Sequence, residues 1–287
     1  MGWVEPEAGT LAQAEDFYVR FWGVRGSIAC AGHEFERYGG NTSCIEIRCG
    51  KHILVFDGGT GIRALGEALK PEEPVDLDLF FSHSHFDHIV GIPFFGSLFN
   101  AQNKVRLWAG HLLPDRTLKD VMGKMMAAPL FPVPPEIFAA QTSFLDFRAG
   151  ESFEPRPGVR LVTAPLNHPN HATGYRVEFN GQSICYITDT EHKKDGLDQG
   201  ILRLIREADI VIYDATYTDE EYPRFAGWGH STWQEGVRLA DAAEIKKLVI
   251  FHHDPSHDDT IMDRIAEAAE KARPGTIVAR EGLTLQP

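Results

Sequence analysis

The chain has 287 residues, of which 43% are hydrophobic and 24% are charged, and its formal net charge is −13. This acidic balance argues against sequence-independent binding of nucleic acid, which depends on Lys and Arg side chains that neutralise phosphates. No apolar run reaches the roughly 18 residues that a membrane span needs. Residues 1–16 are acidic and lack the basic and apolar pattern of a secretory signal, so we expect a cytoplasmic protein with free thiols.

Strand-like and helix-like segments alternate along the chain, without a long linker or an internal repeat. In chain order, the patterning predicts strands at 17–22, 43–48, 52–56, 77–82, 105–109, 159–163, 175–179, 183–188, 210–213 and 247–251. It predicts helices at 62–69, 118–126, 197–207, 232–242 and 258–272, the last with Asp258 as its N-cap. Many strands with helices between them fit two sheets packed face to face with helices outside. We therefore expect a single domain over residues 1–287.

A proline-rich stretch interrupts this alternation, within a cap-like insertion that we expect around residues 112–150. The prolines at 129–135 cannot lie inside a helix or a strand. The wider segment 122–138 is apolar, and it is either a cap packed over the core or part of a pocket lining. The sequence leaves both interpretations open.

Four potential metal ligands lie within six residues, directly after the apolar run 77–81. They are His83, His85, Asp87 and His88. Imidazole and carboxylate are ligands that zinc, manganese and iron accept, and holding such groups together is costly unless a cation pairs with them. Further candidates follow later strands, namely His168, Asp189 and His252. Because sites are often assembled from loops at one edge of a sheet, the pattern predicts a metal centre for hydrolysis.

An ordered set of motifs extends this pattern over most of the chain. The motifs are FDGGTG (56–61), SHSHFDHIVGIP (82–93), NHPNHATGYRVE (167–178), ITDTE (187–191), DIVIYDATY (209–217), GHST (229–232) and LVIFHHDP (248–255). The set resembles the metallo-β-lactamase-fold hydrolases, and within them the phosphodiesterase branch that includes the transfer-RNA 3′-processing nuclease tRNase Z. The resemblance implies an α/β (α+β) fold, a four-layer αββα sandwich.

The resemblance also implies two divalent metal ions, with zinc expected and manganese or iron as alternatives. One ion would be held by His83, His85 and His168, and the other by Asp87, His88 and His252, with Asp189 bridging the two. Between the candidates His252 and His253, the motif alignment favours His252. A hydroxide shared by the ions would be the nucleophile, since metal-bound water has a pKa of roughly 7. His at position 85 and Asp at position 189 differ from the Glu of redox di-iron relatives and the Cys of many β-lactamases, which argues against both of those activities.

Beyond the ligands, the resemblance assigns catalytic roles to Asp87, His230 and Asp214. In nuclease-like relatives the GHST histidine contacts the scissile phosphate and helps to protonate the leaving oxygen, with an acidic residue as its partner. Here that partner, Asp214, lies in Tyr-Asp-Ala-Thr rather than in the His-Glu-Ala-Thr usual in that branch. Ser231 and Thr232 are expected to bind substrate, and a helix cap is their alternative role.

Asp57, at the end of the strand 52–56, has two interpretations. It either accepts a hydrogen bond from a ligand imidazole, behind the metal, or forms the turn that opens the glycine loop. The sequence gives the two equal support.

The substrate is the least determined feature of the sequence. The chain lacks the Gly/Pro- and Lys-rich arm with which the nuclease relatives hold RNA, and its charge is strongly negative. We therefore expect a small-molecule phosphodiester such as a cyclic nucleotide, and neither extended nucleic acid nor a membrane as a partner; a homodimer is compatible with the sequence. The alternatives are a tRNase Z-like ribonuclease, a thioester or lactone hydrolase on the same scaffold, and a metal-binding sensor without catalysis.

Overall fold

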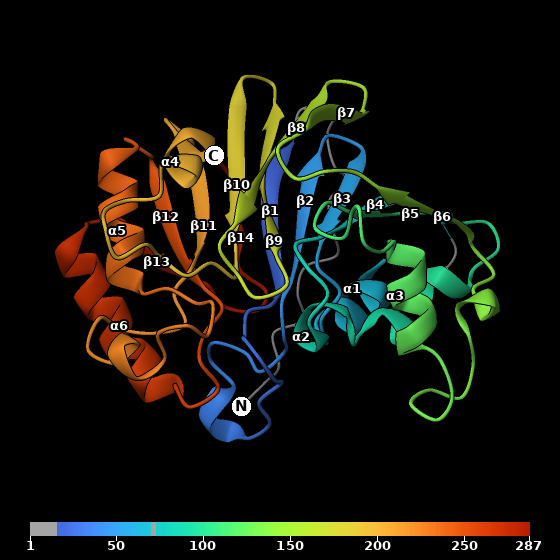
Figure 1. Cartoon of the computed structure of the whole chain (residues 1–287), viewed down its shortest axis with the longest axis horizontal. Helices are drawn as coiled ribbons and strands as arrows, with labels where there is room; N and C mark the ends of the chain where they lie inside the picture. The colour runs from blue at the N-terminus through green and yellow to red at the C-terminus, as the bar shows by residue number, and fades with distance from the viewer. Residues whose placement is uncertain (1–15, 70–72) are drawn as a thin grey trace, which may run out of the picture.

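A computed structural model of the chain describes residues 16–69 and 73–287, and in it two seven-stranded sheets pack face to face (Figure 1). The first sheet has the order β14 (Thr284–Leu285), β1 (Phe17–Gly23), β2 (Cys44–Cys49), β3 (His52–Phe56), β4 (Asp76–Phe81), β5 (Lys104–Ala109) and β6 (Gln141–Asp146). The second has the order β13 (Ile277–Val278), β12 (Lys247–Phe251), β11 (Ile210–Asp214), β10 (Gln182–Ile187), β9 (Ala172–Phe179), β8 (Val159–Leu166) and β7 (Ser152–Arg156).

Helices cover the outer face of each sheet, as Figure 1 shows. They are α1 (Ile62–Ala68), α2 (Phe86–Ile89) and α3 (Leu118–Met125) on the side of the first sheet, and α4 (Gln199–Ile205), α5 (Trp233–Ala242) and α6 (Asp259–Ala272) on the side of the second. The main core lies between the sheets and contains Phe56 and Phe80 from the first and Tyr186 and Phe251 from the second. Separate apolar clusters lie beneath the outer helices. The predicted four-layer αββα sandwich is confirmed.

Three of the strands that lead into predicted ligands, β4, β10 and β12, have parallel neighbours and are deeply buried, whereas β8, which leads to His168, pairs antiparallel with β7 and β9. β3, β4, β5 and β6 run parallel in the first sheet, and β10, β11, β12 and β13 run parallel in the second. All five residues of β11 are buried, as expected for a parallel strand covered on both faces. Because the carboxyl ends of parallel strands meet at one edge, the segments after β4, β10 and β12 are brought to the same side of the molecule.

The predicted elements occur close to their expected positions, and four strands were missed. β13 and β14 have two residues each, too few for a periodic signal, and β6 and β7 have no fully buried residue and no clear apolar alternation. Asp258 caps α6 as predicted, accepting a hydrogen bond from the Ile261 amide. All four cysteines are free.

The insertion expected around 112–150 needs correction. Its last part, Gln141–Asp146, is β6 and extends the first sheet rather than capping it. Between 122 and 138 the buried side chains are Met122 and Met126, whereas Leu130 is 75% exposed. The segment is therefore mostly a surface loop, because its prolines keep it out of regular structure and its apolar side chains find few partners.

Two predictions concern targeting and membranes. The acidic stretch 1–16 lies, except for Asp16, outside the described residues. Over 16–69 and 73–287, none of the helices has the length and apolar character needed to cross a membrane.

Candidate metal centre

The predicted ligands converge at the edge of the sandwich where the parallel strands end. His83 lies two residues after β4, Asp189 two residues after β10, and His252 directly after β12. The short helix α2, which begins at Phe86, carries Asp87 and His88. Segments separated by more than 160 residues in the chain thus meet in one cluster.

The predicted ligands form two groups, in each of which the potential ligand atoms lie within 4.8 Å of one another. His230 belongs to two further groups of this kind, one with His168 and Asp189 and one with Asp214 and His252. The imidazole group consists of His83, His85 and His168. The carboxylate group consists of Asp87, His88, His252 and Asp189. This is the division that the motif resemblance implies.

Asp189 lies between the groups and turns one oxygen toward each. Its Oδ2 is 3.6 Å from His83 Nε2 and 3.7 Å from His168 Nε2. Its Oδ1 is 3.2 Å from His88 Nε2 and 3.3 Å from His252 Nε2. A carboxylate in this position can contribute one oxygen to each of two cations.

The imidazoles are oriented by hydrogen bonds on their outer nitrogens. His88 Nδ1 is 2.8 Å from Asp57 Oδ2, and His168 Nδ1 is 2.7 Å from the Gly229 carbonyl oxygen. The Nδ1 of His252 and of His83 lie 2.9 and 3.1 Å from the hydroxyls of Thr216 and Ser82. This arrangement leaves the other ring nitrogen free to face the centre, as in protein metal sites generally.

The ring nitrogens that face the centre are placed to bind a cation rather than to hydrogen-bond with one another. The buried Nε2 atom of His83 has no hydrogen-bond partner among the described residues, and His88 Nε2 lies 3.2 Å from one oxygen each of Asp87 and Asp189 without hydrogen-bond geometry. His168 Nε2 and His85 Nδ1 face each other at 3.0 Å. Burying unpaired polar atoms costs roughly 1–3 kcal/mol each, and a divalent cation would satisfy them together. The residues present therefore suit two divalent metal ions.

Burial and charge give the two groups opposite electrostatic character. Burial holds the pKa of His83 well below its ordinary value, so this imidazole is neutral. Burial would also lower the pKa of His88, but the charges of Asp189, Asp87 and Asp57 raise it well above the ordinary value. Burial would raise the pKa of Asp189, but the neighbouring histidines His252, His88 and His83 lower it strongly. The carboxylate group is thus a buried anionic site.

Several residues of the centre have left-handed backbone conformations. Asp57, Asp189 and His252 have φ angles of 60°, 57° and 63°, directly after or within two residues of a strand end. Such conformations cost non-glycine residues about 1–3 kcal/mol and are concentrated at functional sites. Ser27, at φ 62°, is a fourth case, and its amide donates a 2.7 Å hydrogen bond to Asp87 Oδ2.

Asp57 lies behind the carboxylate group, as the first of its two interpretations proposed. Besides contacting His88, it accepts hydrogen bonds from the Ser82 amide at 2.7 Å and hydroxyl at 2.8 Å, and from the Tyr186 hydroxyl at 2.9 Å. The carboxylate is fully buried. It orients one metal-facing imidazole while also stabilising the turn.

His230 and Asp214 form a buried pair next to both groups. His230 Nδ1 is 3.0 Å from Asp214 Oδ2 and 3.9 Å from Asp189 Oδ2. Burial would lower the pKa of His230, but the charge and hydrogen bond of Asp214 raise it to about 9. Asp214 also accepts hydrogen bonds from the Thr190 amide and the Thr216 hydroxyl. The pair can hold a proton close to the metal centre at neutral pH.

The substrate-binding role predicted for Ser231 and Thr232 is corrected by their surroundings. Both residues are fully buried. The Ser231 hydroxyl accepts from the Tyr213 hydroxyl at 2.9 Å and lies 3.0 Å from His192 Nδ1. Thr232 caps α5 by accepting from the Glu235 amide, and its hydroxyl donates to Asp219. Their oxygens are occupied within the protein, so the cap interpretation applies to Thr232.

The structure also separates His252 from His253. His253 Nε2 lies 2.8 Å from the Ala279 carbonyl oxygen, on the side of the chain away from the ligand groups. His252 is the one that contacts Asp87 and Asp189.

Three exposed apolar side chains lie close in sequence to residues of the centre. We call Ile28, Phe86 and Trp228, which are 65%, 69% and 64% exposed, the apolar rim. Phe86 lies between the ligands His85 and Asp87 in the chain, and Trp228 is two residues before His230.

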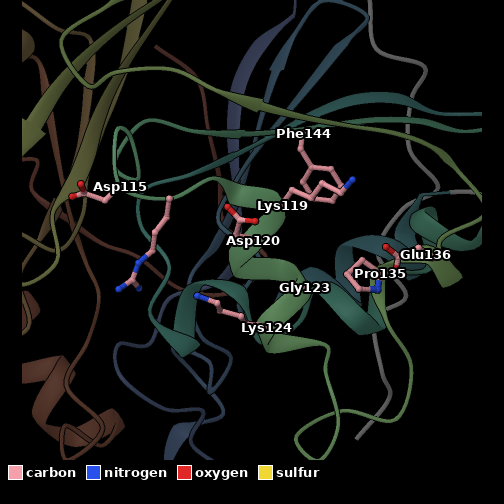
Figure 2. A pocket seen from close by; sticks show the side chains of 9 residues that line it. Asp115, Lys119, Asp120, Gly123, Lys124, Pro135, Glu136 and Phe144 are labelled. Atoms are coloured by element: carbon pink, nitrogen blue, oxygen red, sulfur yellow. The ribbon is translucent and has the colours of Figure 1, made fainter.

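A cavity of about 830 Å³ lies elsewhere, against α3 (Figure 2). Its lining is mostly charged and includes Lys119, Asp120, Lys124 and Glu136. None of its lining residues belongs to the two ligand groups. From the segment 122–138, for which a pocket lining was one of the two interpretations, Gly123, Lys124, Pro135 and Glu136 line this cavity away from the centre.

Comparison with known proteins agrees with this geometry. Residues 52–253 match the family model of the beta-lactamase superfamily domain. A ribonuclease Z from Exiguobacterium sibiricum is 24% identical over 283 residues, covering 80% of this chain and 88% of that relative.

Two solved structures share the fold. Human tRNase Z, short form, is 18% identical with a TM-score of 0.67, covering 94% of this chain and 98% of its own. Zn²⁺-bound PqqB from Methylobacterium extorquens is 18% identical with a TM-score of 0.70, covering 94% of this chain and 100% of its own. With the family match spanning every ligand of both groups, the chain belongs to the beta-lactamase superfamily and is a metal-dependent hydrolase of the metallo-β-lactamase fold.

Proposed function

We propose that this protein is a dinuclear-metal phosphodiesterase that hydrolyses a small phosphodiester, with a cyclic nucleotide as the preferred substrate class. The observation that carries the proposal is the position of His230 beside Asp189, the residue shared by the two ligand groups. A buried proton donor at that point suits a reaction in which an alkoxide leaves phosphorus.

Some residues of the centre would bind the metal ions, and others would transfer a proton. The imidazole group and the carboxylate group would hold one cation each, and Asp189 would contribute to both sites. Two divalent cations would lower the pKa of bound water to roughly 7 and offset charge on the phosphate. Asp214 keeps His230 protonated and oriented, so that Nε2 of His230 can donate a proton to the leaving oxygen. The Ser27 amide fixes the Asp87 carboxylate.

A small, planar substrate is supported by the surroundings of the centre. The net charge of −13 disfavours a polyanion, which would need a basic surface. The apolar rim offers Phe86 and Trp228, two exposed aromatic side chains adjacent in sequence to residues of the centre. Stacking of a nucleobase on an aromatic side chain contributes about 1–3 kcal/mol, so either ring could retain a nucleotide whose phosphate lies at the metals.

Zinc is the metal we propose, since the solved structure of PqqB with this fold is Zn²⁺-bound and the ligands are histidine and aspartate. Manganese and iron are the alternatives that the same ligands accept. A second candidate function, tRNase Z-like cleavage of RNA, is favoured by the relatives named ribonuclease Z.

The test is a turnover assay with protein loaded with zinc or manganese. Substrates are 2′,3′- and 3′,5′-cyclic nucleotides, bis(p-nitrophenyl) phosphate, a precursor transfer RNA and a lactone. We expect cyclic nucleotides to be hydrolysed and the lactone to be left intact. Cleavage of the RNA in preference to every small phosphodiester would favour the second candidate, and no cleavage of any phosphodiester would refute the proposal.

Variants of the apolar rim test whether its aromatic side chains bind the nucleobase. Trp228→Ala and Phe86→Ala should raise KM for the cyclic nucleotide by about 5-fold or more, with less effect on an aliphatic phosphodiester. Phe99→Ala is the matched control, because Phe99 is also an exposed aromatic residue but is not close in sequence to any residue of the two ligand groups.

A further inference from the structure

Glu191, the last residue of the motif ITDTE, makes an unusual set of hydrogen bonds near the centre. Its carboxylate accepts from the Tyr222 hydroxyl at 2.9 Å, from the Gly227 amide at 2.8 Å and from the Gly229 amide at 2.9 Å. All three donors belong to the loop between β11 and α5, which also carries His230. One side chain therefore binds this loop at three points.

The backbone of Glu191 is itself held in place. Its amide donates to the Asn167 carbonyl oxygen at 2.7 Å, and its carbonyl accepts from the Asn167 side chain at 2.9 Å. Asn167 directly precedes the ligand His168 in the chain. The carboxylate thus extends from a fixed point beside the imidazole group.

The turn that Glu191 binds is shaped for an anion. Gly227 and Gly229 have φ angles of 95° and 90°, conformations that side-chain-bearing residues rarely adopt. Amides in such a turn point toward one spot and form a concave site for negative charge. The Glu191 carboxylate occupies this turn, with its two oxygens 2.8 and 3.0 Å from the Gly227 amide nitrogen and one of them 2.9 Å from the Gly229 amide nitrogen.

Gly229 connects the Glu191 carboxylate to the metal centre, because it contacts both Glu191 and His168. Its carbonyl accepts from His168 Nδ1, and because a carbonyl can only accept, His168 carries its proton on Nδ1 and presents Nε2 to the centre. The packing is tight, since a Cβ on Gly229 would lie 2.4 Å from His168 Nδ1 and 2.3 Å from Pro169 Cδ. The next residue is His230.

We propose that Glu191 is a positioning residue: by holding the 227–229 turn it sets the tautomer and place of His168 and the place of His230. It touches neither metal nor substrate. The effect of Glu191 on His230 rests on the proposed function. The effect of Glu191 on His168 rests only on the imidazole group and does not depend on that function.

The proposal is tested with Glu191→Gln and Glu191→Ala. Glutamine keeps the size of the side chain, but it is neutral and turns donor N–H groups toward amides that are donors themselves. Glu220→Ala is the matched control, because Glu220 is an exposed acid on the same loop. Folding is checked by circular dichroism, and if the alanine variant does not fold, the glutamine variant carries the test.

Two readouts do not depend on activity. In metal-free protein we expect amide hydrogen exchange at Gly227 and Gly229 to be at least about tenfold faster in both Glu191 variants. In competition with a chelator, we expect zinc affinity to fall by about 10–100-fold, as is typical when a residue behind a ligand is removed. Unchanged exchange and zinc affinity in Glu191→Gln would overturn the proposal.

Kinetics separate this inference from the proposed function. With an active wild type, kcat should fall by about 10–100-fold in Glu191→Gln while KM changes less than about twofold, because Glu191 does not contact substrate. A rise in KM with unchanged kcat would contradict a positioning role. If the wild type hydrolyses no phosphodiester, the proposed function fails, while exchange and zinc affinity still decide the role of Glu191.

Discussion

The two ligand groups are built on different electrostatic principles. The imidazole group is neutral, and uncharged groups hold it from behind: the Ser82 hydroxyl and the Gly229 carbonyl. The carboxylate group is buried and anionic, and it has a further carboxylate, Asp57, behind His88. Since Coulomb attraction strengthens in a buried, low-dielectric site, we expect the carboxylate group to bind its cation more tightly. The imidazole group depends on Asp189 for negative charge.

Removing Asp189 tests both groups together and should have the largest effect. Asp189→Ala takes the only negative charge from the imidazole group and one of two from the carboxylate group, so zinc bound per chain should fall below two. Turnover should fall by more than about 1,000-fold, beyond the loss typical of a single donor. Elemental analysis and initial rates measure the two effects. Two tightly bound zinc ions in this variant would show that Asp189 is not shared.

Removing His230 should leave both groups intact but lose the proton donor. We expect His230→Ala to retain its metal and to lose about 10²–10⁴-fold in kcat, the usual contribution of acid catalysis. A substrate with a good leaving group, such as p-nitrophenolate, should lose much less because it needs no protonation. Metal retention together with a near-normal rate on a cyclic nucleotide would remove the catalytic assignment.

The division into two groups could be predicted from sequence, and so could Asp57 behind one of them, whereas the other supporting groups could not. HxHxDH and the later His and Asp residues carry side-chain chemistry that a motif records, and strand-end positions explain why they meet. The groups behind them include backbone atoms, such as the Ser27 amide and the Gly229 carbonyl, which any residue possesses. The substrate-binding role expected for Ser231 and Thr232 shows a different limit: their hydroxyls look available in sequence, but both are buried and hydrogen-bonded within the protein, and Thr232 has the alternative role of a helix cap.

Changing Asp57 should weaken one group selectively. In Asp57→Asn the charge behind His88 is lost, and zinc affinity of the carboxylate group should fall by about 10–100-fold. The matched change for the other group is Asn170→Ala, which removes an exposed amide 3.3 Å from His85 Nε2 and should cost less than about threefold. Chelator titrations that resolve two zinc ions measure both. Equal losses would mean that the two groups do not differ as their surroundings indicate.

The smallest expected effect is a change in pH dependence, because it leaves every metal ligand in place. Asp214 raises the pKa of His230 to about 9 against the opposing effect of burial, so His230 is protonated at neutral pH and loses its proton as the pH rises through that value. An acid catalyst works only below its pKa, so the alkaline limb of the kcat profile should report His230. In Asp214→Asn the main charge that raises this pKa is gone.

The pKa of His230 should then fall toward or below the ordinary value for histidine of about 6.5, and the alkaline limb should move to lower pH. At pH 8 this lowers kcat by at least about tenfold, while at pH 6 the variant keeps more of its rate. Asp189 and Asp87 also raise the pKa of His230, and cations bound in the two groups would offset their charges. The test is therefore the direction in which the alkaline limb moves, not the pKa that it reaches. If the alkaline limb of the kcat profile does not move in Asp214→Asn, the proton donor is a group other than His230. The pair formed by His230 and Asp214 would then contribute to the two ligand groups only through packing.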